Sequence, residues 1–199
     1  RLVDPLGHAT ELTYDARGQL TGLKDAKGQS TRYGYDALGR LLAVTNALGQ
    51  TTAYAYDALG NIASKTDALG RVMTYDYNRR NELLQEAGPM ERITAFAYDS
   101  MGNMTGLTSP DGTLTSYAYD RLSRLTNIAY PDGKQVNYDY DASGRLDRII
   151  ANDGREIDIV YSGASRLVSQ VRANPNGAVR TWNYAYRASN HVLEWESRI

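Results

Sequence analysis

The sequence predicts an all-β fold: a repetitive antiparallel β-meander of about 18 strands, built from 21-residue hairpin repeats. A strict long period, two glycine-marked turns in each period and a recurring Tyr-x-Tyr alternation support this prediction. One tyrosine recurs at intervals of 21 residues, at Tyr14, Tyr35, Tyr56, Tyr77, Tyr98, Tyr119, Tyr140 and Tyr161. A period of this length indicates a repeated supersecondary unit, because helices and strands repeat over only a few residues.

The first turn of each repeat follows the recurring tyrosine and its neighbouring aspartate. Glycine closes this turn at Gly18, Gly39, Gly60, Gly102 and Gly144, whereas Asn81, Ser123 and Ser165 take its place in other repeats. Glycine at the end of such a turn suits a type I turn that is closed by a residue at positive φ. We therefore expect a tight hairpin at each of these positions.

The second turn comes about ten residues later in each repeat. Its glycines are Gly7, Gly28, Gly49, Gly70, Gly112, Gly133 and Gly154. Glu91 interrupts this series, and Gly88-Pro89 just before it indicates a rearranged turn. A ninth copy, ending at Tyr186, follows Tyr161 after 25 residues, which places an insertion near 174–177.

Runs of six or seven residues between the turns are expected to be strands. Tyrosines two residues apart place both rings on one face of a strand, whereas a helix would separate them by about 200°. The residues between the paired tyrosines face the other way and are small or polar: Gly34, Ala55, Asp76, Ala97, Ala118 and Asp139. The partner strand carries an apolar residue at Leu20, Leu41, Ile62, Leu83, Met104, Leu125, Leu146 and Leu167.

The composition favours a thin sheet over a thick core. The chain has 16 Tyr, 2 Trp and 1 Phe, and rings with an apolar body and a polar tip suit a sheet that is wetted on both faces. With 22 basic and 23 acidic residues, no basic groove for nucleic acid is expected. The chain has no cysteine, and no apolar run reaches the ~20 residues of a membrane-spanning helix.

The aspartates that follow the recurring tyrosines are the first candidates for chemistry: Asp15, Asp36, Asp57, Asp99, Asp120 and Asp141. Their periodic placement predicts side chains that cap their own turns, because one aspartate per turn does not gather the six or more oxygens of a calcium site. We identify no acid–base pair, activated nucleophile or metal cluster. The sequence therefore predicts no enzyme activity, cofactor, catalytic residue or metal site.

The residues on which we expect the repeat to depend are the recurring tyrosines and the first-turn glycines. They are Tyr14, Tyr35, Tyr56, Tyr77, Tyr98, Tyr119, Tyr140, Tyr161, Gly39, Gly60, Gly102 and Gly144. Cross-strand packing of the rings is the expected role of the tyrosines. A stacking platform for carbohydrate is the alternative.

The repeated motif resembles the YD repeat of bacterial Rhs proteins. The resemblance rests on a Tyr-Asp-Ala-Leu-Gly-Arg-Leu motif at residues 35–41, followed by Thr-Asn-Ala-Leu-Gly-Gln at 45–50, and it extends from Asp4 to Leu193. This repeat is shared with wall-associated toxins, with the B and C components of insecticidal toxin complexes and with teneurins. The resemblance implies that residues 1–199 form one YD/RHS repeat array of about nine repeats, a fragment of a longer polypeptide.

The family also implies a fold and a function for the array. It would be a curved wall segment of an Rhs β-shell, which fits the tendency of open sheets above about ten strands to curl. That shell would enclose and deliver a C-terminal toxin of the same polypeptide, as a polymorphic toxin exported in competition between bacteria. The expected partners are flanking repeats, the enclosed toxin domain and the secretion machinery. An extracellular module that recognises glycans or a partner protein is the alternative.

One segment resembles an Rhs self-cleavage motif only superficially. Residues 4–8 read Asp-Pro-Leu-Gly-His, which lacks the leucine after glycine and lies in register with the ordinary second turns. We therefore expect a turn there.

Overall fold

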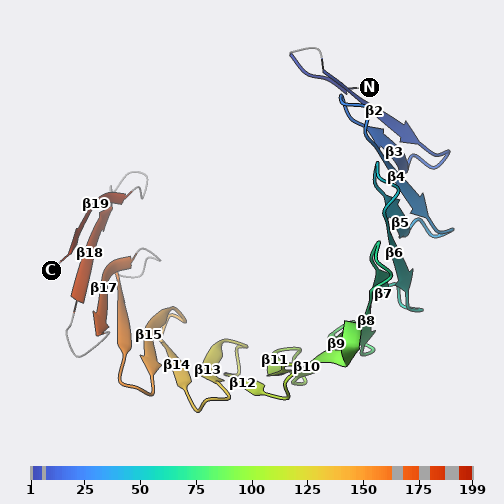
Figure 1. The fold of residues 1–199 in the computed structure, drawn as a ribbon. Helices are drawn as coiled ribbons and strands as arrows, with labels where there is room; N and C mark the ends of the chain where they lie inside the picture. The colour runs from blue at the N-terminus through green and yellow to red at the C-terminus, as the bar shows by residue number, and fades with distance from the viewer. Residues whose placement is uncertain (1, 6–7, 163–167, 175–179, 187–192, 199) are drawn as a thin grey trace. The chain divides into compact units, whose positions relative to one another are not determined.

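The structure, a computed structural model, describes residues 2–5, 8–162, 168–174, 180–186 and 193–198. This part of the chain consists of β-strands and turns, with a single short 3-10 segment, and contains no α-helix. It divides into two compact units, Arg1–Ala95 and Phe96–Ile199. The predicted all-β antiparallel meander is therefore confirmed (Figure 1).

The first unit is a run of antiparallel strands in which each strand pairs with the next. Its strands are β1 (Leu2–Val3), β2 (Ala9–Tyr14), β3 (Leu20–Lys24), β4 (Ser30–Tyr35), β5 (Leu41–Thr45), β6 (Thr51–Tyr56), β7 (Ile62–Thr66), β8 (Val72–Tyr77) and β9 (Leu83–Gly88). β10 (Arg92–Tyr98) pairs with β9 and runs across the boundary between the units.

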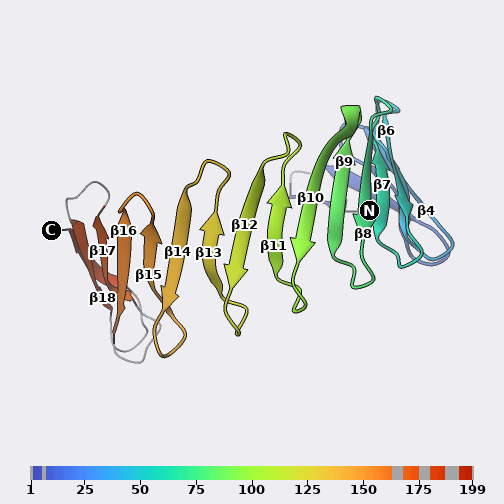
Figure 2. The ribbon, with the colours of Figure 1, turned by 90° about the horizontal axis from the view of Figure 1, so that it is seen from below.

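The second unit repeats this arrangement, and Figure 2 shows its strands in chain order, side by side. Its strands are β11 (Met104–Thr108), β12 (Leu114–Tyr119), β13 (Leu125–Ala129), β14 (Gln135–Tyr140), β15 (Leu146–Ala151), β16 (Glu156–Tyr161), β17 (Val168–Asn174), β18 (Arg180–Tyr186) and β19 (Leu193–Arg198). The described residues thus form 19 strands against about 18 expected, and the two-residue β1 accounts for the difference.

The turns are three-residue hairpin loops closed by a residue at positive φ. At the first of them, the N–H of Asp15 donates to the carbonyl of Gln19 (2.9 Å), and the N–H of Gly18 donates to that of Asp15 (3.1 Å). Gly18 has φ 81°, and Asn81 and Ser123 adopt φ 60° at the same place in their repeats. The predicted positions of Gly7, Ser165 and Leu167 and most of the expected insertion lie outside the described residues.

The turn between β9 and β10 is irregular, as its missing glycine predicts. Pro89–Glu91 form a 3-10 segment in which Met90 has φ 64° and Glu91 has φ 55°. Both residues therefore occupy the left-handed region of backbone conformation, which residues other than glycine and asparagine rarely adopt.

A β-bulge follows the first turn of the repeat. In the β4–β5 hairpin, Gly34 is opposite Ala43 and Tyr35 is opposite Leu41, so Leu42 is the extra residue. The same shift recurs in the hairpins β2–β3, β6–β7, β8–β9, β12–β13, β14–β15, β16–β17 and β18–β19. Such a bulge increases the local twist of its hairpin.

Each unit is one layer thick. No hydrophobic side chain among the described residues is fully buried, and in β6 Tyr54 and Tyr56 are half-buried, whereas Ala53 and Ala55 are exposed. Because none of the described residues forms a second sheet or a helix over either face, the sheet is held by its hydrogen bonds and by contacts between neighbouring strands. The predicted thin wall, wetted on both faces, is confirmed.

Candidate functional site

The aspartate of the first turn caps its own hairpin. Asp36 Oδ1 accepts hydrogen bonds from the N–H groups of Leu38 and Arg40, both at 2.9 Å. The same pair of bonds is made by Asp15, Asp57, Asp99, Asp120 and Asp141. The interpretation of these aspartates as turn caps is therefore confirmed.

The second oxygen of the capping carboxylate binds the side chain four residues later. Arg40 Nε donates to Asp36 Oδ2 at 2.7 Å, and Arg124 and Arg145 bind Asp120 and Asp141 in the same way at 2.7 and 2.6 Å. Donation by the Arg40 backbone N–H, together with this contact, lowers the pKa of the Asp36 carboxyl. The Asn61 side chain is the main cause of the lowered pKa of Asp57.

These arginines also lie on the recurring tyrosine of the next repeat. The guanidinium of Arg40 stacks over the ring of Tyr56 at 4.6 Å, and Arg124 and Arg145 stack over Tyr140 and Tyr161 at 4.4 Å. An arginine plane over an aromatic face is attractive because the cation meets the negative face of the ring.

The hydroxyl of the recurring tyrosine completes the connection to the preceding repeat. Tyr56 Oη donates to the carbonyl of Leu41 at 2.8 Å, fifteen residues earlier in the chain. Tyr35, Tyr140 and Tyr161 make the equivalent bond to Leu20, Leu125 and Leu146. We call Asp36, Arg40, Tyr56 and the Leu41 carbonyl, with their equivalents in other repeats, the inter-repeat clamp.

Neighbouring first turns are also bonded to each other along the edge of the sheet. Gln19 Nε2 donates to the carbonyl of Gly39 at 3.0 Å, and Arg17 donates to that of Ala37 at 2.6 Å. Asn61 Nδ2 reaches Asn81 Oδ1 at 2.9 Å in the same way. Successive first turns therefore lie side by side.

The structure places the expected repeat residues in regular positions. Gly39, Gly60, Gly102 and Gly144 have φ of 84°, 92°, 89° and 79°. Burial raises the pKa of the Tyr77 and Tyr119 hydroxyls, whereas Tyr14 is 57% exposed. That the fold depends on these tyrosines and glycines stays a prediction.

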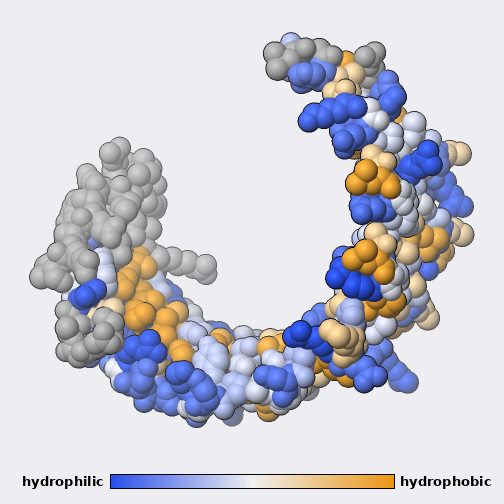
Figure 3. All heavy atoms as spheres, in the orientation of Figure 1, coloured by the Kyte–Doolittle hydropathy of each residue, from blue (hydrophilic) through white to orange (hydrophobic). Residues whose placement is uncertain are grey.

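The second unit has one apolar face. Residues directly opposite in neighbouring strands share a face, and Tyr138, Ile149, Ile157 and Ala173 form one such row across β14–β17. Hydrophobic residues gather beside β15 and β17 (Figure 3), whereas the hydrophobic patches of the first unit are interrupted by hydrophilic residues.

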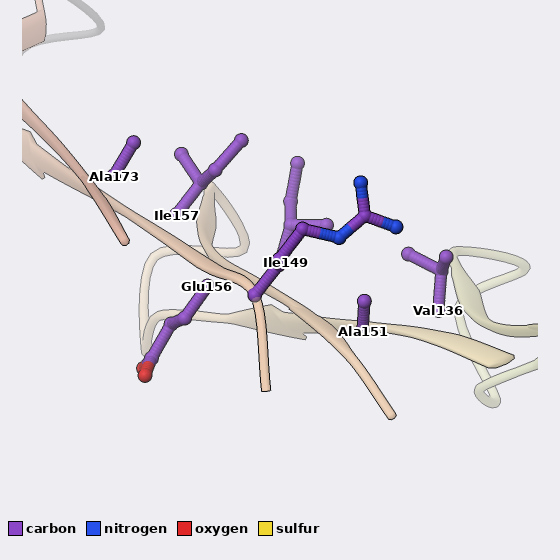
Figure 4. Close-up of a pocket in the computed structure, with 7 residues that line it drawn as sticks. Val136, Ile149, Ala151, Glu156, Ile157 and Ala173 are labelled. Atoms are coloured by element: carbon purple, nitrogen blue, oxygen red, sulfur yellow. The ribbon is translucent and has the colours of Figure 1, made fainter. Parts of the chain in front are cut away.

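A shallow hollow of about 320 Å³ lies on this face. Ile149, Ile157 and Ala173 line it, together with Val136 and Ala151, and the charged Arg155 also borders it. Figure 4 shows these side chains on one side of the sheet, whereas Glu156 points to the opposite side.

The opposite face of the second unit is polar. Arg148 Nε contacts both Asp158 and Glu156 at 2.9 Å, and Asn127 Nδ2 donates to Asn137 Oδ1 at 2.8 Å. The two faces thus differ in chemistry, although the hairpins that form them are alike.

The described residues contain no group of three or more His, Cys, Asp or Glu side chains that could hold a metal ion. Among them there is also no helix of the length and hydrophobicity needed to cross a membrane. The features of the site are thus contacts that join repeats, not a converging set of reactive groups.

A strip of repeated β-hairpins one layer thick, joined by the inter-repeat clamp, defines an all-β repeat protein. The sequence pattern of the RHS repeat matches residues 1–30, 14–51 and 35–72, and that of the Teneurin YD-shell matches residues 68–196. The chain therefore belongs to the RHS and YD-shell family, whose role is structural.

Solved structures with the same fold come from toxin complexes. The chain is similar to the crystal structure of TcdB2-TccC3-Cdc42 (16% identity, TM-score 0.66, 90% of this chain and 13% of that chain) and to that of TcdB2-TccC3-TEV (17%, 0.66, 91% and 13%). It is also similar to the Tc holotoxin pore of Photorhabdus luminescens (17%, 0.59, 90% and 13%). The chain thus spans about an eighth of the length of these proteins. No curated protein matches it significantly.

Proposed function

We propose that this chain is a wall segment of an Rhs-type β-cage, which encloses a C-terminal toxin of the same polypeptide until delivery. Membership of the shell family and the toxin-complex folds of its structural neighbours support this proposal. The flanking repeats of the cage and the toxin domain would be its partners. The cage would be exported by a bacterium as an effector against competing cells, through its secretion machinery.

The apolar face of the second unit is the observation that carries the proposal. A sheet exposed to water on both faces has no physical reason to place Ile149 and Ile157 together on one of them, since exposing apolar area is unfavourable. If the wall contacts an enclosed, partly unfolded domain, that domain covers these side chains and removes their apolar surface from water, which is favourable. In this function the wall acts by excluding target molecules and proteases, without catalysis.

Limited proteolysis of the full-length polypeptide tests the proposal. We expect the downstream domain to resist a protease that digests the same domain expressed alone. Ile149→Asp combined with Ile157→Asp should shorten the protected lifetime severalfold, because charge on this face weakens the contact with the enclosed domain. Val160→Asp is the matched control, since Val160 is 43% exposed on the polar side of the same strand.

Equal digestion of the enclosed and isolated domains would reject the cage. Recognition of glycans by an extracellular array is the alternative. It is less favoured, because the hydroxyls of Tyr35, Tyr56, Tyr140 and Tyr161 already donate to backbone carbonyls. A glycan array probed with the chain and with Tyr54→Ala separates the two functions, since only a binding module would show a specific glycan that the variant loses.

A further inference from the structure

The hollow on the apolar face of the second unit lies beside a second turn that begins with a small residue. Ala151 opens this turn, and its N–H donates to the carbonyl of Arg155 at 2.8 Å. Tyr130 opens the equivalent turn 21 residues earlier, and its N–H makes the same bond to Lys134 at 2.8 Å. The turn thus accepts an aromatic ring at this position, and alanine leaves space where a ring would fit.

Arg155, at the rim of the hollow, resembles the arginines of the inter-repeat clamp but lacks their ring. Its Nε and Nη2 bind Asp153 Oδ2 at 2.8 and 2.7 Å, as Arg145 binds Asp141. Arg145 stacks over a tyrosine, and its side chain is 18% exposed, whereas that of Arg155 is 58% exposed. Among the described residues, no aromatic ring lies within stacking distance of Arg155.

The chemistry of the hollow favours a neutral aromatic group. Ile149 and Ile157 provide apolar contact, and a guanidinium at the rim is attracted to the face of a ring. Asp153 already compensates the charge of Arg155, so a carboxylate or phosphate would gain less there. The volume of about 320 Å³ is at the lower end of the roughly 300–1,000 Å³ of ligand pockets, which suits one side chain better than an extended ligand.

We propose that this hollow binds one aromatic side chain, which packs on Ile149 and Ile157 and stacks against Arg155. The contact repeats, with a ring from outside the sheet, the stack that Arg124 and Arg145 make with tyrosines of the chain itself. The ring comes from the enclosed C-terminal domain, and in this respect the inference rests on the proposed function. A partly unfolded domain is a suitable source, because unfolding exposes the large apolar surface of aromatic side chains.

Methyl NMR of the 199-residue chain tests the hollow itself. The isoleucine methyl signals are followed during titration with N-acetyl-tyrosinamide, and with N-acetyl-leucinamide as the aliphatic control. We expect the tyrosine derivative to shift the signals of Ile149 and Ile157 and to bind more tightly than the leucine derivative. Arg155→Gln should weaken its binding about threefold, the size of a partly exposed cation–π contact. Arg71→Gln, which breaks the same kind of ion pair in a turn of the first unit, should leave binding unchanged.

Ala151→Tyr supplies the ring from the chain itself. The variant should fold, because Tyr130 is accepted in the equivalent turn. Its ring should shift the methyl signals of Ile149 and Ile157 without any ligand, and N-acetyl-tyrosinamide should no longer bind. Methyl signals that ignore the tyrosine derivative, equal binding of the leucine derivative, or an Arg155→Gln chain that binds like the original would each overturn the site. These results do not depend on whether the downstream domain is protected from protease.

The same titration of the full-length polypeptide tests the source of the ring. The enclosed domain should occupy the hollow, so the signals of Ile149 and Ile157 should already be shifted and N-acetyl-tyrosinamide should not bind. Deletion of the downstream domain should restore binding. A full-length polypeptide that binds the tyrosine derivative as the 199-residue chain does, or an exclusion that survives the deletion, would overturn the enclosed domain as the partner of the hollow. Protease protection of the downstream domain is measured separately, so the cage and this contact can fail independently.

Discussion

The hydroxyl of the recurring tyrosine connects two repeats through the backbone. Tyr56 donates to the Leu41 carbonyl while its ring lies beneath Arg40, and Arg40 holds the carboxylate that caps the turn. One side chain thus links the strand of one repeat to the turn of the preceding one. The preference for Tyr over Phe in this chain follows, because Phe provides the ring without the donor.

Replacing Tyr56 with Phe should destabilise the chain by about 1–2 kcal/mol, because the Leu41 carbonyl loses a partner in a half-buried place. Urea denaturation followed by circular dichroism measures the free energy of unfolding. Tyr54→Phe removes a hydroxyl from the same strand, one for which the described structure shows no hydrogen bond, and should cost under about 0.5 kcal/mol. Equal effects of the two changes would contradict the clamp.

The sequence was sufficient to predict the turns and the capping aspartates, but not the clamp. A turn is local, so Asp36 and Gly39 can be interpreted from their neighbours alone. The Tyr56–Leu41 bond joins atoms whose approach depends on the register of the strands and on the bulge at Leu42. The sequence contained one indication of the clamp: Arg40, Arg124 and Arg145 each follow the residue that closes a first turn.

At the scale of the hairpin, the first and second turns differ although their loops are alike. Hairpins with a first turn contain a β-bulge, as between Gly34 and Tyr35, whereas the registers across the second turns are regular. Twist is therefore added once in each repeat. The alternation of residues could predict the strands but not this extra residue, because Leu41 and Leu42 are both acceptable in a strand.

The β9–β10 hairpin offers a test of the strain in its turn. Glu91 has φ 55° at the place where the other described second turns have glycine. Glu91→Gly should raise the free energy of unfolding by about 1 kcal/mol, since the left-handed conformation then carries no steric cost. Gly70→Glu, the reverse change in a regular turn where Gly70 has φ 76°, should lower it by a similar amount. Thermal melting of both variants measures this, and a Glu91→Gly chain that melts lower would refute the strain.

At the scale of the whole molecule, capping carboxylates make the stability depend on pH. The folded-state pKa values of Asp36, Asp57, Asp99, Asp120 and Asp141 are lowered by donors in their own turns. A lowered pKa contributes stability that is fully present above the unfolded value of about 3.9 and is lost as the pH falls through the folded value. The melting temperature should therefore be level from pH 7 to about pH 5 and should fall below about pH 4.

Asp57→Asn should reduce this acid sensitivity without removing the cap. Asn46 shows that an amide oxygen accepts the same two N–H bonds, from Leu48 and Gln50 at 3.0 Å. The variant should lose less stability between pH 5 and pH 3 than the original chain. Melting curves over this range test the expectation. If the melting temperature of the variant falls with pH as steeply as that of the original chain, groups other than Asp57 cause the acid sensitivity.

The single layer without a core was predictable from the scarcity of Phe, but the difference between the two faces of the second unit was not. Tyr138 and Ile149 share a face only because of the register of β14 and β15. In the sequence, Ile149 and Ile150 stand next to each other and so face opposite sides of the strand, but only the pairing shows which of them shares a face with Tyr138. The chemistry of a face is thus a property of the assembled strands.

Contacts that reach only the adjacent hairpins have a consequence for how such genes change length. Duplication or loss of 21 codons adds or removes one whole hairpin and leaves every remaining Tyr–Leu and Arg–Tyr contact with an equivalent partner. A change of another size within a strand would break them, whereas in a loop it would be tolerated. Recombination between similar repeats can therefore lengthen or shorten the protein by whole repeats, because each added repeat forms the same hairpin and the same contacts with its neighbours.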